Sequence, residues 1–111
     1  MYCILVTGIP AAGKSTMAEV LSERLKLPVI SKDTIKELLF DNVGFQSRTE
    51  KVNLGIASAE IMYYIASQLM KTEQAFILEN NFEYLSEQGI KNILEKYQYS
   101  ALTIRVVSET H

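Results

Sequence analysis

Gly8-Ile9-Pro10-Ala11-Ala12-Gly13-Lys14-Ser15 is the stretch that decides the fold, because it matches the pattern G-x-x-x-x-G-K-[ST] at every fixed position. A short apolar run at residues 2–7 precedes it, with the length and composition of a buried strand. Gly8 and Gly13 permit backbone conformations and close approaches that a Cβ atom would forbid, so successive N–H groups can converge on an anion. The sequence therefore predicts a strand, a phosphate-binding loop and a helix in succession.

Each residue type in this motif suits a part of a bound nucleotide. Lys14 is expected to reach the β- and γ-phosphates as a catalytic residue, and the Ser15 hydroxyl to bind the Mg²⁺ held between them. Thr16 is expected to open a helix whose positive N-terminal end points at the same anion. The predicted nucleotide-binding residues are Gly8, Ile9, Pro10, Ala11, Ala12, Gly13, Lys14, Ser15 and Thr16. A strand-to-helix turn without a ligand is the alternative, and the complete match disfavours it.

Composition predicts one domain, residues 1–111, because a chain of 111 residues buries a single modest core. The net charge is −2, with lysines and arginines scattered among acids, so we expect no nucleic-acid partner. No stretch approaches the roughly 20 apolar residues that span a bilayer, and the N-terminus lacks the basic region of a signal peptide. We therefore expect a cytoplasmic protein without a membrane partner. The single cysteine, Cys3, is expected to be a buried small hydrophobe.

Apolar patterning divides the chain into alternating strands and helices. Strands are predicted at residues 2–7, 29–30, 74–79 and 101–107. Helices are predicted at residues 16–26, about 31–40, about 49–71 and 84–97. The first helix is expected to bury Met17, Val20, Leu21 and Leu25. This alternation predicts right-handed crossovers and a parallel sheet.

Polar residues follow the predicted strands at the end where such sheets bind their ligands. Ser15 follows the first strand, Asp33 follows the second and Glu79 ends the third. Ser108 and Glu109 follow the fourth. Because the carboxyl ends of parallel strands lie at one edge, we expect these side chains to gather around the phosphate-binding loop.

Two acids are placed for phosphoryl transfer, which needs a group to orient or deprotonate the nucleophile. Asp33 could accept the proton of an acceptor hydroxyl, making it both a catalytic and a substrate-binding residue. Its alternative role is a helix N-cap, for which Ser31 is also placed. Glu79 ends an apolar strand, a position from which an acid can bind Mg²⁺ directly or through water. The alternative interpretation is that Glu79 is only a solvent-exposed residue at the end of the strand.

Weaker candidates for substrate binding lie in the predicted loops. Arg48, between the second and third helices, could meet substrate or phosphate or be a surface charge. Asn80, followed by Asn81, could hydrogen-bond substrate, although two asparagines after a strand are also ordinary turn residues. Lys32 and Lys36 are expected to lie on a solvated face and to serve solubility.

With the segments SKDTIKELL at residues 31–39 and ILENNF at residues 77–82, the loop gives the chain a resemblance to P-loop small-molecule kinases. It is similar to the ATP-dependent phosphotransferases that include chloramphenicol phosphotransferase-like and zeta-toxin-like enzymes. The resemblance implies an α/β P-loop NTPase fold, a three-layer α/β/α sandwich with a parallel sheet. It also implies ATP and Mg²⁺ as cofactors, a small-molecule phosphoryl acceptor, and a catalytic base at the position of Asp33.

The sequence differs from that group at the end of the chain. Members of that group continue past the fourth strand with an arginine-bearing lid and a fifth strand, whereas this sequence ends at His111. We therefore expect a sheet truncated after its fourth strand, either in a piece of a longer protein or in a minimal one whose lid is lost or supplied by another subunit of an oligomer. The leading hypothesis is an ATP-binding kinase core that phosphorylates a small-molecule hydroxyl. A nucleotide hydrolase or switch and a non-catalytic nucleotide-binding module are the alternatives.

Overall fold

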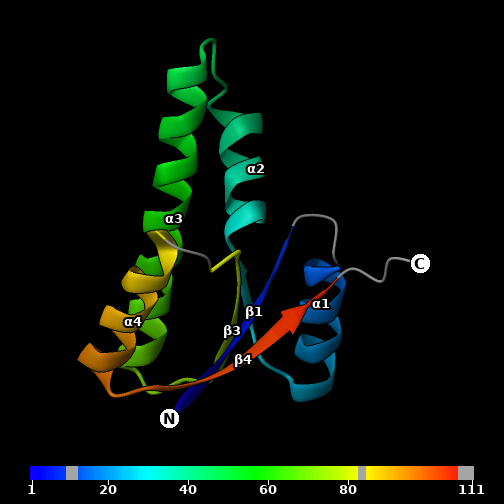
Figure 1. Ribbon diagram of the computed structural model, residues 1–111, viewed down its shortest axis with the longest axis vertical. Helices are drawn as coiled ribbons and strands as arrows, with labels where there is room; N and C mark the ends of the chain where they lie inside the picture. Colours follow the sequence, from blue (N-terminus) through cyan, green and yellow to red (C-terminus); the bar gives the residue numbers. More distant parts are fainter. Residues whose placement is uncertain (10–12, 83–84, 108–111) are drawn as a thin grey trace.

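A four-stranded parallel sheet lies between two helical layers in the computed structural model, which describes residues 1–9, 13–82 and 85–107 (Figure 1). The elements in chain order are β1 (Tyr2–Gly8), α1 (Lys14–Leu25), β2 (Val29–Ser31), α2 (Lys32–Asn42), α3 (Arg48–Lys71), β3 (Phe76–Glu79), α4 (Leu85–Tyr97) and β4 (Ser100–Val106). Helix α1 covers one face of the sheet, and α3 and α4 cover the other. The predicted α/β class and its order of strands and helices are confirmed.

The sheet has the strand order β2-β3-β1-β4, and every neighbouring pair is parallel. Val6 and Ser31 both lie opposite Glu79 in the register of the central strands. The carboxyl ends of β1, β2 and β3 are therefore level with one another. The predicted parallel sheet is confirmed, and the polar residues that follow these strands start from one edge.

The core has two sides because β1 alternates between them. Cys3 and Leu5 pack with the side chains of α3 and α4, and Ile4 and Val6 pack with those of α1. Successive side chains of a strand point to opposite faces, so a strand covered on both sides must be apolar throughout. The prediction that Cys3 is buried is confirmed, because none of its surface is exposed.

The predicted inner face of α1 is wrong at three of its four positions, and only Leu21 packs against the core as predicted. Met17, Val20 and Leu25 are 36%, 40% and 46% exposed, whereas Ala18 is fully buried against β1 and β3. The helix begins at Lys14, two residues earlier than predicted, and it begins there because Gly13 takes a left-handed conformation at the N-cap. The position of the loop therefore fixes which side of α1 faces the sheet. Because Ala18 has a small side chain, the helix can approach the sheet closely.

Helices α2 and α3 form a hairpin that extends beyond the carboxyl edge of the sheet (Figure 1). The Ser47 hydroxyl accepts a hydrogen bond from the Glu50 N–H at 3.1 Å and donates one to the Glu50 carboxylate at 3.3 Å, so Ser47 is the N-cap, at the S-x-x-E spacing of a capping box. This cap starts α3 at Arg48, so the prediction that Arg48 lies in the preceding loop is wrong. None of the helices in the described part of the chain has the length and apolar character needed to cross a membrane.

Candidate active site

The two glycines that frame the phosphate-binding motif are required for different reasons. Gly13 has φ +94°, and an added Cβ would make only ordinary contact with Val106 at 3.9 Å, so its backbone conformation is what demands glycine. Gly8 has φ +151°, and a Cβ there would clash with the carbonyl oxygen of Val106 on β4. The close passage of β4 therefore adds a steric requirement at Gly8. Pro10, Ala11 and Ala12, in the middle of the predicted loop, lie outside the described residues.

Lys14 starts helix α1 and is buried, with 7% of its surface exposed. Its aliphatic stem packs near Gly8 at the end of β1. The first hydrogen bond of the helix runs from the Met17 N–H to the Gly13 carbonyl at 3.0 Å. The preceding N–H groups of the first turn therefore have no partner within the helix, as at any helix N-terminus, and could donate to an anion. Ser15 and Thr16 are exposed on this turn, as is Ile9 beyond β1.

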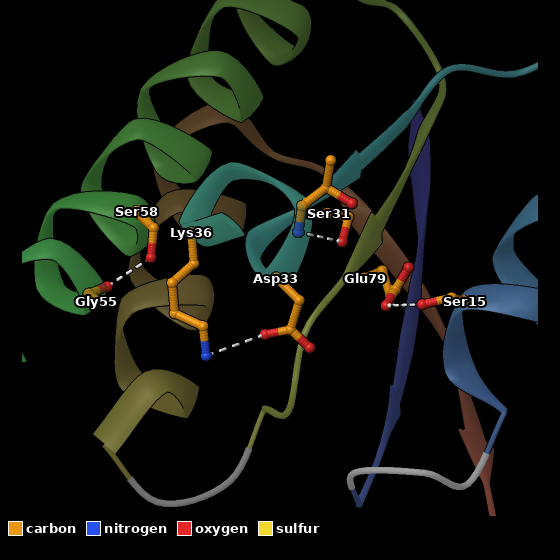
Figure 2. A network of polar contacts seen from close by, with 8 residues as sticks. Ser15, Ser31, Asp33, Lys36, Gly55, Ser58 and Glu79 are labelled. Atoms are coloured by element: carbon orange, nitrogen blue, oxygen red, sulfur yellow. Dashed lines mark hydrogen bonds and ion pairs between the residues drawn. The ribbon is translucent and has the colours of Figure 1, made fainter. Parts of the chain in front are cut away.

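Ser15 and Glu79 meet across the end of the sheet (Figure 2). The Ser15 hydroxyl donates a hydrogen bond to Glu79 Oε2 at 3.0 Å, joining residues 64 positions apart in the sequence. Glu79 is only 3% exposed, so the solvated strand end considered as its alternative is wrong. A buried carboxylate needs compensating partners, and one neutral hydroxyl is a weak partner for a full negative charge. This environment suits a cation bound beside the carboxylate.

Asp33 lies in the first turn of α2, two residues after the end of β2 (Figure 2). The helix is capped by Ser31, whose hydroxyl accepts a hydrogen bond from the Thr34 N–H at 3.2 Å. The alternative role of Asp33 as the N-cap is therefore wrong. Its carboxylate instead forms an ion pair with Lys36 Nζ at 3.6 Å and is half exposed. Asp33 thus presents an oriented, solvent-accessible carboxylate at the same sheet edge as Glu79.

The turn after β3 is tied to β1 by two hydrogen bonds. The Asn80 N–H donates to the Val6 carbonyl at 3.1 Å, and the Phe82 N–H donates to the Thr7 hydroxyl at 3.0 Å. Asn80 is 6% exposed, so its side chain is buried beside the site rather than presented on a surface turn. The sequence analysis missed Thr7, although a polar residue at the end of an apolar strand was a usable indication.

A cavity of about 720 Å³ lies between α2 and α3, and we call it the α2–α3 cavity. Its walls include four cations and two aromatic rings, namely Lys32, Lys36, Arg48, Lys51, Phe40 and Phe45. The sequence analysis treated Lys32 and Lys36 as solvated and did not consider Lys51. Positions 32, 36 and 40 on α2 and positions 48, 51 and 55 on α3 recur at helical spacing, and this periodicity was the indication that could have revealed the cavity.

A family model described as an AAA domain matches residues 3–106. The chain belongs to this AAA domain family. The match covers all of the sheet except Tyr2 at the start of β1, and it includes both residues of the Ser15–Glu79 pair. Ser108, Glu109 and His111, considered in the sequence analysis, lie beyond the match and outside the described residues.

Solved structures of other proteins show the same fold as this AAA domain. A candidate kinase from Chloroflexus aurantiacus is 33% identical, with a TM-score of 0.89, and the match covers 96% of this chain and 59% of that one. An APS kinase from Mycobacterium tuberculosis is 16% identical, with a TM-score of 0.62 and coverage of 96% and 75%. A gluconokinase from Sinorhizobium meliloti is 16% identical, with a TM-score of 0.53 and coverage of 92% and 56%. The predicted P-loop small-molecule-kinase fold is confirmed, and the chain spans 59% of the length of the Chloroflexus protein.

Proposed function

We propose that this AAA domain binds Mg·ATP at residues 8–16 and transfers the γ-phosphoryl group to a hydroxyl of a small molecule. The observation that carries the proposal is the Ser15–Glu79 hydrogen bond of 3.0 Å, beside the buried Lys14 and at the sheet edge where Asp33 also lies. A buried acid, a hydroxyl and a lysine at the end of a parallel sheet suit the charge of a metal–triphosphate complex. The likeness to three proteins described as kinases supports the same reaction class.

The donors of the site fit Mg²⁺. This ion takes oxygen ligands, and proteins usually supply one or two of them while phosphates and water supply the rest. Ser15 Oγ and Glu79 Oε2 are two such oxygens. Among the side chains that the structure describes, no three from His, Cys, Asp or Glu gather as an all-protein metal site would require. When bound, Mg²⁺ would neutralise charge on the β- and γ-phosphates.

The residues of the chain then have distinct tasks in the reaction. Lys14 neutralises the transferring phosphoryl group, and the N–H groups of the first turn of α1 orient the phosphates. Asp33 accepts the proton of the acceptor hydroxyl, and Lys36 holds the carboxylate in place. The acceptor oxygen forms a bond to the γ-phosphorus while the bond to the bridging oxygen breaks. ADP leaves with that electron pair, so atoms and charge balance.

Calorimetry of the whole chain with Mg·ATP tests the first half of the proposal. We expect binding by the wild type and at least a tenfold weaker affinity in Lys14→Ala, because a charge-assisted contact to phosphate is lost. Lys26→Ala is the matched control, since Lys26 follows the opposite end of α1 and is exposed. Absence of binding by the wild-type chain would overturn the nucleotide assignment. ADP formation that requires an added hydroxyl compound tests the second half, and ADP formed equally fast without one would indicate a hydrolase.

A further inference from the structure

The α2–α3 cavity concentrates positive charge in a protein whose net charge is −2. Two of its cations, Lys32 and Lys36, come from α2, and the other two, Arg48 and Lys51, come from α3. None of the described residues that line the cavity is acidic. Like charges brought together on two helices repel one another, so an arrangement of this kind is favourable when an anion lies between them.

Most of this charge lacks a carboxylate partner within the described part of the chain. Lys36 forms the ion pair with Asp33, and Lys51 Nζ lies over the rings of Phe40 and Phe45, 6.0 and 5.5 Å from their centroids. The two rings contact each other edge to face, with centroids 4.9 Å apart. Lys51 is therefore held on an aromatic surface, with its charge left for a ligand.

Gly55 gives a second, independent observation. It lies in the interior of α3 on the wall of the cavity, and a Cβ added there would meet nothing within 4 Å. Glycine inside a helix is less stable than alanine, and neither packing nor a positive φ requires it at this position. Gly89 on α4 differs, because a Cβ there would lie 3.2 Å from the ring of Tyr63. The open space at Gly55 is therefore available to a ligand.

We propose that the α2–α3 cavity binds a small phosphomonoester, and that this compound is the phosphoryl acceptor. The substrate class rests on the proposed kinase function, whereas the anion site rests on the cavity itself. Lys32, Arg48 and Lys51 supply three positive charges that carboxylates of the described chain leave unpaired, which suits a phosphate dianion better than a carboxylate monoanion. A cavity of about 720 Å³ is of the size that holds small molecules.

The position of Asp33 gives the expected orientation of the acceptor. Lys36 joins the two parts of the site, because it lines the cavity and contacts the Asp33 carboxylate (Figure 2). Phe40 lies seven residues after Asp33, a separation of about 10 Å along a helix. An acceptor with its phosphate near Lys51 and Phe40 would therefore present a hydroxyl to Asp33 when about that distance separates the two groups.

Direct titration tests the anion site without relying on catalysis. Uridine 5′-monophosphate, glucose 6-phosphate, their unphosphorylated parents and gluconate are titrated up to 10 mM into the Lys14→Ala chain, in which the nucleotide loop is weakened, and backbone NMR shifts are recorded. We expect both phosphates to shift Lys51 and Gly55, with affinities at least tenfold tighter than those of their parents and of gluconate. Equal affinity for parent and phosphate, tighter binding of gluconate, or no shift by 10 mM would overturn the proposal.

Steady-state kinetics with Mg·ATP and the best phosphomonoester tests the assignment of the acceptor. Arg48→Gln and Lys51→Gln should each raise the acceptor KM about tenfold and leave the KM for ATP unchanged, because each removes one contact to phosphate. Lys71→Gln, at the far end of the same helix, is the matched control and should change neither constant. A short oligonucleotide that binds more tightly than any small phosphate would contradict the proposed ligand class.

Gly55→Ala separates a ligand role from a structural one. This variant should raise the melting temperature by about 4 °C, because alanine favours the helix, and should still raise the acceptor KM. Gly89→Ala, which changes packing away from the cavity, should leave the acceptor KM unchanged. An unchanged acceptor KM in Gly55→Ala would contradict the proposal. If the wild type shows no Mg·ATP binding, the kinase proposal fails, and the titrations still decide the anion site.

Discussion

The separate roles of Ser31 and Asp33 give the sharpest test of the site. Both residues lie at the start of α2, and the sequence alone allowed either one to cap the helix. In the structure the Ser31 hydroxyl accepts the Thr34 N–H at 3.2 Å, while the Asp33 carboxylate turns toward Lys36. We predict that Ser31→Ala mainly lowers stability and that Asp33→Asn mainly lowers the rate of phosphoryl transfer.

The magnitudes follow from the contacts that each change removes. Replacing an N-cap serine by alanine costs about 1 kcal/mol, which corresponds to about 4 °C in melting temperature for a chain of this size. Asp33→Asn loses a half-exposed ion pair and a favourable charge near the helix N-terminus, for a total below about 1 kcal/mol. Loss of a general base should lower kcat by about 10²- to 10⁴-fold.

The assay measures urea unfolding and ADP formation on the same preparations, with the best acceptor from the titrations. Asp41→Asn is the matched control, because Asp41 is an exposed acid at the other end of α2. Ser31→Ala should keep kcat within about threefold of the wild type wherever it is folded. The reasoning is refuted if folded Asp33→Asn retains kcat within threefold, or if Ser31→Ala has wild-type stability.

Three further predictions concern the metal site and the core. Glu79→Gln should leave the affinity for ATP without Mg²⁺ unchanged and abolish most of the gain that Mg²⁺ gives, measured by calorimetry with and without the ion. Gly89→Ala should lower the free energy of unfolding by about 1 kcal/mol in urea, because crowding against Tyr63 outweighs the better helix propensity. Burial raises the pKa of the Cys3 thiol to about 11 from 9.0. The folded state thus favours the neutral thiol, so its contribution to stability should be complete below pH 9 and lost between pH 9 and 11, and the fall in stability over this range should be smaller in Cys3→Ala.

The order of strands and helices could be predicted because local patterns determine it. The apolar runs that became β1 and β3 are buried on both sides, as their composition indicated, and the loop motif fixed the direction of the chain between β1 and α1. The rotation of α1 could not be predicted from its apolar residues. Hydrophobic spacing favoured Met17 and Val20 as the inner face, yet the left-handed conformation of Gly13 turns Ala18 toward the sheet.

The site was predictable to the extent that sheet topology determines it. Parallel strands end at one edge, so acids after β2 and at the end of β3 had to lie near the loop, and the Ser15–Glu79 hydrogen bond follows from that topology. The choice of cap between Ser31 and Asp33 depended on a shift of two residues in the helix start, which propensity does not resolve. The S-x-x-E spacing of Ser47 and Glu50 is a sequence signature of a helix start. Using this signature would have predicted that α3 begins at Arg48.

The α2–α3 cavity shows why the proposed acceptor side of the site is harder to predict than the proposed nucleotide side. Phosphate binding by a loop uses backbone N–H groups, so a short pattern of glycines is enough to reveal it. The cations of the cavity come from two helices, α2 and α3. The packing of these helices brings together Lys36 and Lys51, which in the sequence are separated by the end of α2, the turn and the start of α3. Within its own helix, neither the half-buried Lys36 nor the exposed Lys51 differs from an ordinary helical lysine. The two side chains line one cavity because Ser47 ends the turn and fixes where α3 begins. A change in that turn should therefore weaken binding of the proposed acceptor more than it weakens binding of ATP.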